Sequence, residues 1–244
     1  MTLTLNCDLG ESFGSWVMGM DEAVMPHIDL ANIACGFHAG DPLVMQRTLA
    51  LAKQHCVRVG AHPGYDDLAG FGRRSMHCQP EEIIALMLYQ ISALEGMAKA
   101  QGISVDYVKP HGALYNDMMA KDEVRQAVLQ AMAAHHNPPI LIMQATPDAD
   151  QHRCEAEAFG IRLWFEAFAD RAYSDDGRLL ARSKPGAVLD HRQMLVQAEQ
   201  LAHQGRVTTA SGNTLALQVD TLCVHGDNPQ GVKAIQELRR IVQG

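Results

Sequence analysis

The chain has 244 residues, of which 47% are hydrophobic, 20% charged and 5% aromatic. This length and hydrophobic content favour one domain over residues 1–244, built around a single large core, and the scarcity of aromatic residues favours an α/β fold over a β-sandwich. The net charge of -8 would repel a phosphate backbone, so we expect no nucleic-acid partner.

No segment of the sequence has the pattern of a membrane or targeting element. Residues 1–6 contain no basic residue, and no apolar run approaches the roughly 18 residues that a membrane span needs. We therefore expect a cytoplasmic protein. The six cysteines form no Cys-x-x-Cys pair, which argues against a zinc ribbon or a thioredoxin-type motif, and we expect them to be reduced and mostly buried.

Seven apolar stretches of strand length each end in a polar segment that contains glycine. In chain order they are Leu3–Cys7, Asp29–Cys35, Val57–Ala61, Tyr107–Val108, Ile140–Met143, Arg162–Phe165 and Leu222–Val224. Helical patterns lie between them, the clearest over Glu81–Gln101, where apolar residues recur every three or four positions. This repetition predicts a parallel sheet with crossover helices, either a closed barrel or a doubly wound sheet.

Turn and capping residues set the expected element boundaries. Asp41-Pro42 and Asn228-Pro229 predict helix starts, and Gly102 and Gly205 predict helix ends. Two segments interrupt the alternation, Tyr173–Val188 around Asp175-Asp176-Gly177 and Val207–Val219 around Ser211-Gly212-Asn213. Both are predicted to be β-hairpins inserted near the mouth of a barrel.

Polar residues cluster where the predicted strands end. Because the carboxyl ends of parallel strands meet at one rim, six segments distant in sequence should form one site. Four histidines each follow a different strand beside glycine or proline, so we expect at least two to be functional, although a lone histidine is more often structural: His38, His62, His111 and His225. The histidines that lack such neighbours are expected at the surface: His55, His135, His136, His152, His191 and His203.

Carboxylates near the same strand ends are candidates for proton transfer, which the opening of an amide requires. They are Asp8, Glu11, Asp41, Glu166, Asp170 and Asp227. Asp41 precedes a proline and is expected to cap a helix, and Asp170 is expected to pair with Arg171.

Basic residues could hold an anionic substrate at this rim. Lys109 could bind a carboxylate, polarise a carbonyl or, with a lowered pKa, form a Schiff base. Arg73, Arg74 and Arg171 could grip a carboxylate or phosphate bidentately. The sequence contains no phosphate-binding G-x-x-x-x-G-K-[ST] loop, no G-x-G-x-x-G after a strand, no G-x-S-x-G and no H-E-x-x-H. Any use of a nucleotide would then depend on a partner or on a different kind of site.

Seven motifs in order resemble those of the LamB/YcsF family. They are Leu5–Gly14, Ala34–Pro42, Gly60–Asp67, Phe71–Arg74, Val108–Asn116, Glu166–Tyr173 and Cys223–Pro229. The resemblance implies a distorted parallel β/α barrel of the glycoside hydrolase/deacetylase type. It also implies the A subunit of an ATP-dependent 5-oxoprolinase, which works with subunits B and C to convert 5-oxoproline to L-glutamate with hydrolysis of ATP.

The rim cluster and the resemblance together give the expected site. Catalytic roles fall to Asp8, Lys109, His111 and Glu166, and substrate-binding roles to Glu11, His38, His62, Arg73, Arg171, His225 and Asp227. ATP, with Mg²⁺, is the expected co-substrate and would be bound mainly by the partners. A metal held by Asp8, His38 and His62 stays open, although no two histidines have the spacing of four or five found in metal-dependent relatives of the fold. Two alternatives also stay open, a metal-dependent amidase or deacetylase without ATP and a non-catalytic subunit that binds 5-oxoproline.

Overall fold

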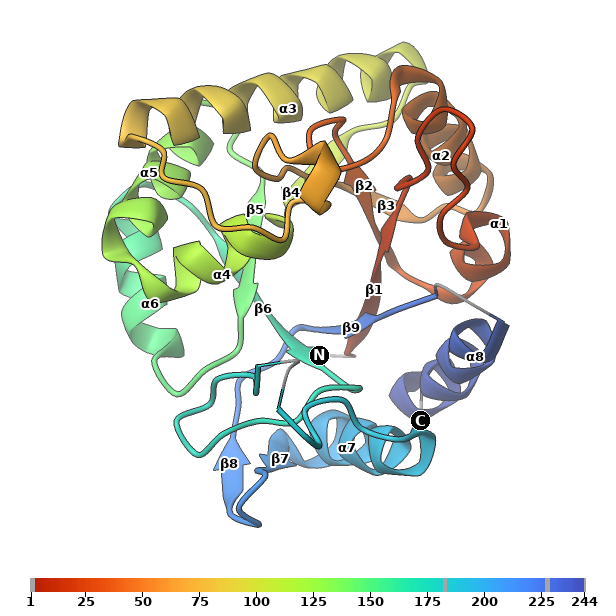
Figure 1. Cartoon of the computed structure of the whole chain (residues 1–244), viewed down its shortest axis with the longest axis vertical. Coiled ribbons are helices and arrows are strands. Elements are labelled where there is room, and N and C mark those ends of the chain that lie inside the picture. The colour runs from red at the N-terminus through yellow and green to blue at the C-terminus, as the bar shows by residue number, and fades with distance from the viewer. Residues whose placement is uncertain (1–2, 182–183, 227–228, 244) are drawn as a thin grey trace.

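Seven parallel strands close into a barrel in the order β1-β2-β3-β4-β5-β6-β9 (Figure 1). This computed structural model describes residues 3–181, 184–226 and 229–243. The strands are β1 (Thr4–Leu9), β2 (Leu30–Ala34), β3 (Arg58–His62), β4 (Val105–Val108), β5 (Ile140–Gln144), β6 (Leu163–Phe168) and β9 (Thr221–Val224). Each corresponds to one of the seven predicted strands, and the closed barrel, rather than the doubly wound sheet, is the correct alternative.

Helices surround this barrel on its outer side (Figure 1). They are α1 (Asp21–Val24), α2 (Pro42–Gln54), α3 (Pro80–Ala100), α4 (Gly112–Ala120), α5 (Asp122–Ala133), α6 (Ala149–Glu157), α7 (His191–Gln204) and α8 (Pro229–Gln243), with short 3₁₀ turns η1 (Met25–His27) and η2 (Leu68–Gly70). The Asp41 carboxylate accepts from the first backbone N–H groups of α2, and Gly205 ends α7 at a φ of 59°. Both predicted boundaries are confirmed; α8 begins at Pro229 as expected, and its proposed cap, Asn228, lies outside the described residues.

The two inserted segments differ in regularity. β7 (Arg206–Thr208) and β8 (Thr214–Ala216) form the predicted antiparallel hairpin, which projects from the barrel in Figure 1. Between Tyr173 and Val188, an isolated antiparallel bridge between Tyr173 and Leu179 flanks the predicted Asp175–Gly177 turn, and a second isolated bridge joins Arg171 to Val188, so the predicted hairpin is present only in irregular form among the described residues. The buried Arg171 guanidinium donates to the carbonyls of Leu180 and Ala187, and so ties the two sides of this segment together beside its backbone hydrogen bonds.

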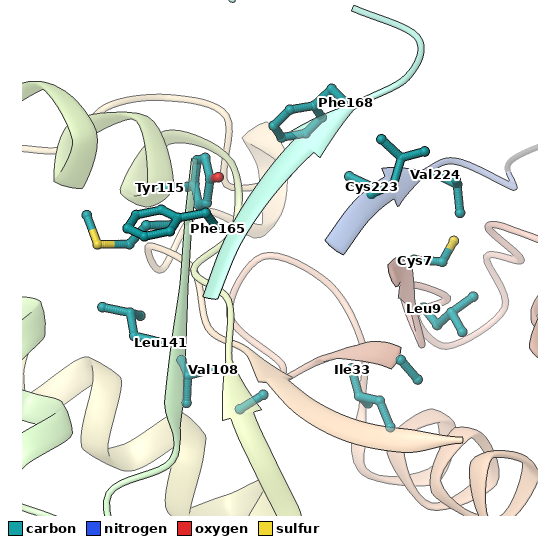
Figure 2. Packing of buried hydrophobic residues seen from close by; sticks show 14 of the residues in the cluster. Cys7, Leu9, Ile33, Val108, Tyr115, Leu141, Phe165, Phe168, Cys223 and Val224 are labelled. Atoms are coloured by element: carbon teal, nitrogen blue, oxygen red, sulfur yellow. The ribbon is translucent and has the colours of Figure 1, made fainter. Parts of the chain in front are cut away.

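The main hydrophobic core lies between the barrel and its helices. Figure 2 shows part of it, with Leu9, Ile33, Val108 and Leu141 on four barrel strands. Among the described helices, α3 alone is long and apolar enough to cross a membrane by length and composition. Its apolar face is buried against α5 and the neighbouring strands, which accounts for its hydrophobic character within the barrel fold.

Side chains also fill the inside of the barrel. Leu30, Tyr107, Ile140 and Ile142 form a separate buried cluster there. Gly60 makes room for this filling, because a Cβ at that position would lie 2.1 Å from the Tyr107 ring. The barrel interior is therefore a packed layer and not a channel.

Two expectations about burial are wrong. His152 is buried, because the helical spacing of Ala149, His152 and Ala156 places all three on the inward face of α6. Of the six free cysteines, three are buried and three are at least partly exposed, among them Cys56 and Cys154.

Candidate active site

The carboxyl ends of the strands surround one cavity of about 450 Å³. Eight of the predicted site residues line it: Asp8, His62, Arg73, Lys109, His111, Glu166, Arg171 and His225. Glu11 and His38 lie directly behind this wall, where Glu11 comes within 3.7 Å of His111. Asp227 lies outside the described residues. The predicted convergence is thus confirmed as geometry, whereas the role of each residue stays a prediction.

Lys109 lines the cavity and has polar neighbours around its amine. Its Nζ is 3.0 Å from Asp8 Oδ1, 3.1 Å from Glu166 Oε2 and 3.3 Å from Cys223 Sγ. Burial favours the neutral amine, but the surrounding groups, Asp8 foremost, outweigh it and raise the pKa of Lys109 well above its usual value. The amine therefore remains an ammonium ion, which disfavours the Schiff-base alternative, since that chemistry needs a neutral amine.

A buried amide network fixes the acids around this ammonium. Asn32 Nδ2 donates to Asn6 Oδ1 and to Asp8 Oδ1, both at 2.8 Å, and Tyr107 donates to Asn32 Oδ1 at 2.8 Å. Asn6 in turn donates to Glu166 Oε2 at 3.3 Å and accepts from Lys109 at 3.1 Å. The roles of Asn6 and Asn32 were missed from the sequence. The available signal was an amide at an inward position of an otherwise apolar strand.

Asp8 and Glu166 differ in which of their oxygen atoms could still bind a ligand. Burial would raise the pKa of Asp8, but the charges of His62 and Lys109 lower it well below its usual range, so Asp8 is ionised. Glu166 is fully buried, and its Oε1 has no hydrogen-bond partner within the part of the chain that the structure describes. Because Glu166 lines the cavity, a bound molecule could satisfy this oxygen.

Three histidine rings pack together beside Asp8. His38 and His111 are stacked, with centroids 3.7 Å apart and planes 3° from parallel, and His62 meets His111 edge-on. Burial and the neighbouring imidazoles lower the pKa of His38 well below its usual value. Burial, followed by the charge of His62, lowers the pKa of His111 to about 3. Both rings are therefore neutral near pH 7.

Backbone carbonyls fix which nitrogen of two rings carries the proton. His62 Nδ1 lies 2.6 Å from the Lys109 carbonyl, and His111 Nε2 lies 2.9 Å from the Phe71 carbonyl. A carbonyl only accepts hydrogen bonds, so both nitrogens must donate. The other two nitrogens, His62 Nε2 and His111 Nδ1, face each other at 2.9 Å.

A carboxylate completes this cluster. Within the described residues, the cluster is a group of side chains that could hold a metal ion. Glu11 Oε1 lies 3.3 Å from His38 Nε2, and one donor atom from each of Glu11, His38, His62 and His111 falls within 4.8 Å of the others. Asp8, expected from the sequence in a metal set with His38 and His62, approaches from the cavity side, with Oδ2 at 3.4 Å from His62 Nε2.

A glycine lets the chain cover the stacked rings. Gly72 has a φ of +60°, and a Cβ there would lie 2.7 Å from His38 Cβ and 2.8 Å from His111 Cδ2. The preceding Phe71 supplies the carbonyl that orients His111. The motif around Arg73 therefore closes over the histidine cluster.

The remaining charged residues have separate environments. His225 Nδ1 lies 3.1 Å from Asp170 Oδ2, so Asp170 pairs with His225; the expected pairing with Arg171 is not what the structure shows for this carboxylate. Burial opposes protonation of His225, but Cys223 and the Asp170 carboxylate raise its pKa well above the usual value. Arg73 is exposed at the cavity, 5.0 Å above the Phe71 ring, whereas Arg74 pairs with Asp67.

Known proteins are similar to this chain in fold and in sequence. The chain is 55% identical to the A subunit of 5-oxoprolinase from Chromohalobacter salexigens over 98% of this chain and 96% of that one, and 54% identical to the Pseudomonas fluorescens protein of the same name over 97% and 95%. The lactam utilization protein from Thermus thermophilus superposes with a TM-score of 0.92 at 39% identity, over 100% of this chain and 96% of that one. Residues 3–244 match the LamB/YcsF family, and the chain belongs to it.

Proposed function

We propose that this chain is the A subunit of a cytoplasmic, ATP-dependent 5-oxoprolinase, which opens the lactam of 5-oxoproline to L-glutamate together with two partner subunits. The names of its relatives support the lactam as substrate class and a role within a multi-subunit enzyme. The observation that carries the proposal is the Lys109 ammonium, which is held between Asp8 and Glu166 in the wall of the rim cavity. Its volume falls within the roughly 300–1,000 Å³ typical of small-molecule sites.

The use of ATP follows from the chemistry of the substrate. A five-membered lactam is a weak electrophile, and its hydrolysis is unfavourable. Transfer of a phosphoryl group to the amide oxygen would activate the carbonyl and couple ring opening to the hydrolysis of ATP. The sequence lacks a P-loop, so we assign the binding of ATP and its Mg²⁺ mainly to the partner subunits.

The cavity residues fit the needs of this ring opening. The Lys109 ammonium can stabilise negative charge on the lactam oxygen, and Arg73 at the mouth can pair with the substrate carboxylate. Water adds to the activated carbonyl carbon, the C–N bond breaks and the ring nitrogen takes up a proton, which leaves an acyl phosphate. A second water hydrolyses it to the carboxylate and inorganic phosphate. Glu166, with an unpartnered oxygen, and the ionised Asp8 are the groups that can accept and return these protons.

A reconstituted assay tests the proposal. Glutamate release from 5-oxoproline is measured with all three subunits and ATP, and then with each component omitted. We expect release only from the complete mixture. Release by this chain alone without ATP would instead establish the metal-dependent amidase alternative, and no release from the complete mixture would refute the proposal.

Variants of the cavity separate catalysis from binding. Lys109→Met and Glu166→Gln should lose at least about 100-fold in kcat while the circular dichroism spectrum is retained. His203→Gln, at an exposed position on α7, serves as the control. Normal turnover in both cavity variants, together with calorimetric binding of 5-oxoproline, would show a non-catalytic chain that only binds the substrate.

A further inference from the structure

We propose that Glu11, His38, His62 and His111 bind one divalent transition-metal ion, with zinc as the preferred ion. The four donors come from the carboxyl ends of β1, β2, β3 and β4 or the segments that follow them, and they lie within 4.8 Å of one another. Three imidazoles and one carboxylate are a ligand set that suits zinc and similar ions, whereas magnesium and calcium prefer oxygen ligands throughout.

The hydrogen bonds of two rings carry the inference. The carbonyls of Lys109 and Phe71 require protons on His62 Nδ1 and His111 Nε2. His111 is neutral, and a neutral imidazole has a single N–H, so His111 Nδ1 presents a lone pair; in the neutral form of His62, Nε2 presents one as well. These lone pairs face each other at 2.9 Å, an arrangement that is repulsive unless a positive charge lies between them.

The same hydrogen bonds are those that orient metal ligands. A ligating histidine commonly donates its other N–H to a backbone carbonyl, which fixes both the tautomer and the ring direction. At zinc–nitrogen bonds of about 2.0–2.1 Å in a tetrahedral site, two ligand nitrogens lie about 3.3 Å apart. The two facing nitrogens therefore need to separate by only a few tenths of an ångström to become ligands.

The surrounding charge favours a cation. Glu11 Oε1 is 3.3 Å from His38 Nε2 and 3.7 Å from His111 Nδ1, and Asp8 Oδ2 is 3.4 Å from His62 Nε2. The Glu11 and His38 side chains are mostly or fully buried, so water screens these interactions little. A divalent ion here would supply a Lewis acid beside the cavity that Lys109 lines.

The inference goes beyond the proposed reaction and is measured without turnover. Metal content of the tag-free, full-length chain is determined by mass spectrometry, and zinc affinity of the chelator-treated protein by competition with a colorimetric chelator. We expect one ion per chain, and an affinity at least about 100-fold lower in Glu11→Gln and His111→Gln. The controls are His203→Gln on the surface and His152→Gln, a buried histidine outside the cluster.

Nuclear magnetic resonance of the imidazole nitrogens distinguishes a bound metal ion from a proton shared between His62 Nε2 and His111 Nδ1. In the chelator-treated protein, His62 Nε2 and His111 Nδ1 should be unprotonated, and zinc should shift both resonances. The inference is overturned if a proton is shared between these nitrogens and zinc leaves them unchanged. It is equally overturned if folded Glu11→Gln, which changes a side chain at the edge of the cluster, binds zinc as tightly as the wild type.

Discussion

Replacing Lys109 by methionine should destabilise the protein through the charges that it leaves behind. Methionine has a similar length, but it removes the ammonium that lies 3.1 Å from Glu166 Oε2. Both side chains are at most 5% exposed, so Glu166 loses its buried cationic partner and retains the neutral Asn6 amide as a donor. Breaking a buried ion pair in this way costs about 3–5 kcal/mol. At about 2–4 °C per kcal/mol for a chain of this size, the melting temperature should fall by roughly 6–20 °C.

A double variant tests whether the buried charge is the cause. Adding Glu166→Gln to Lys109→Met removes the uncompensated carboxylate and should restore at least about 2 kcal/mol in urea denaturation, although turnover stays lost. Lys53→Met, at an exposed position, is the matched control and should change stability by less than about 0.5 kcal/mol. If the double variant is no more stable than Lys109→Met, the buried-charge argument is incorrect.

Three further changes test other parts of the structure. Since the pKa of His225 is raised in the folded state, the stability that its protonation contributes is complete below about pH 6.5 and is lost as the pH rises through the folded pKa. Asp170→Asn should flatten this dependence in melting curves recorded across pH, and an unchanged profile would count against the His225–Asp170 pair. Gly60→Ala should cost about 1–3 kcal/mol or more through its clash with Tyr107, measured by urea denaturation, and a neutral effect would contradict the packing. Asp41→Ala should lower the unfolding free energy by about 1 kcal/mol through loss of the α2 cap, and wild-type stability would show that the cap is dispensable.

The barrel and its rim could be predicted because their signals are local. Each strand is a short apolar run that ends in glycine and polar residues, and parallel strands necessarily bring those ends together. That reasoning correctly places Asp8, Lys109 and Glu166 in one cavity. The same reasoning predicted too regular a hairpin between Tyr173 and Val188, because turn residues do not reveal how many bridges form on either side of the turn.

Contacts within the site could not be predicted from the sequence. The facing of His62 Nε2 and His111 Nδ1 depends on ring rotations that two backbone carbonyls impose. Nothing in the spacing of the histidines encodes those angles. The pairing of Asp170 with His225 likewise joins residues 55 positions apart, whereas the sequence suggested only the adjacent arginine.

The filled barrel interior has a consequence for the entry and release of ligands. Tyr107 and its apolar neighbours fill the barrel interior next to the Asn32 amide, so we expect a small molecule to reach and leave Lys109 from the rim. Substrate and product would then pass through the same opening at the rim. Product release would therefore precede the binding of the next substrate. A partner subunit bound over this opening would control both steps.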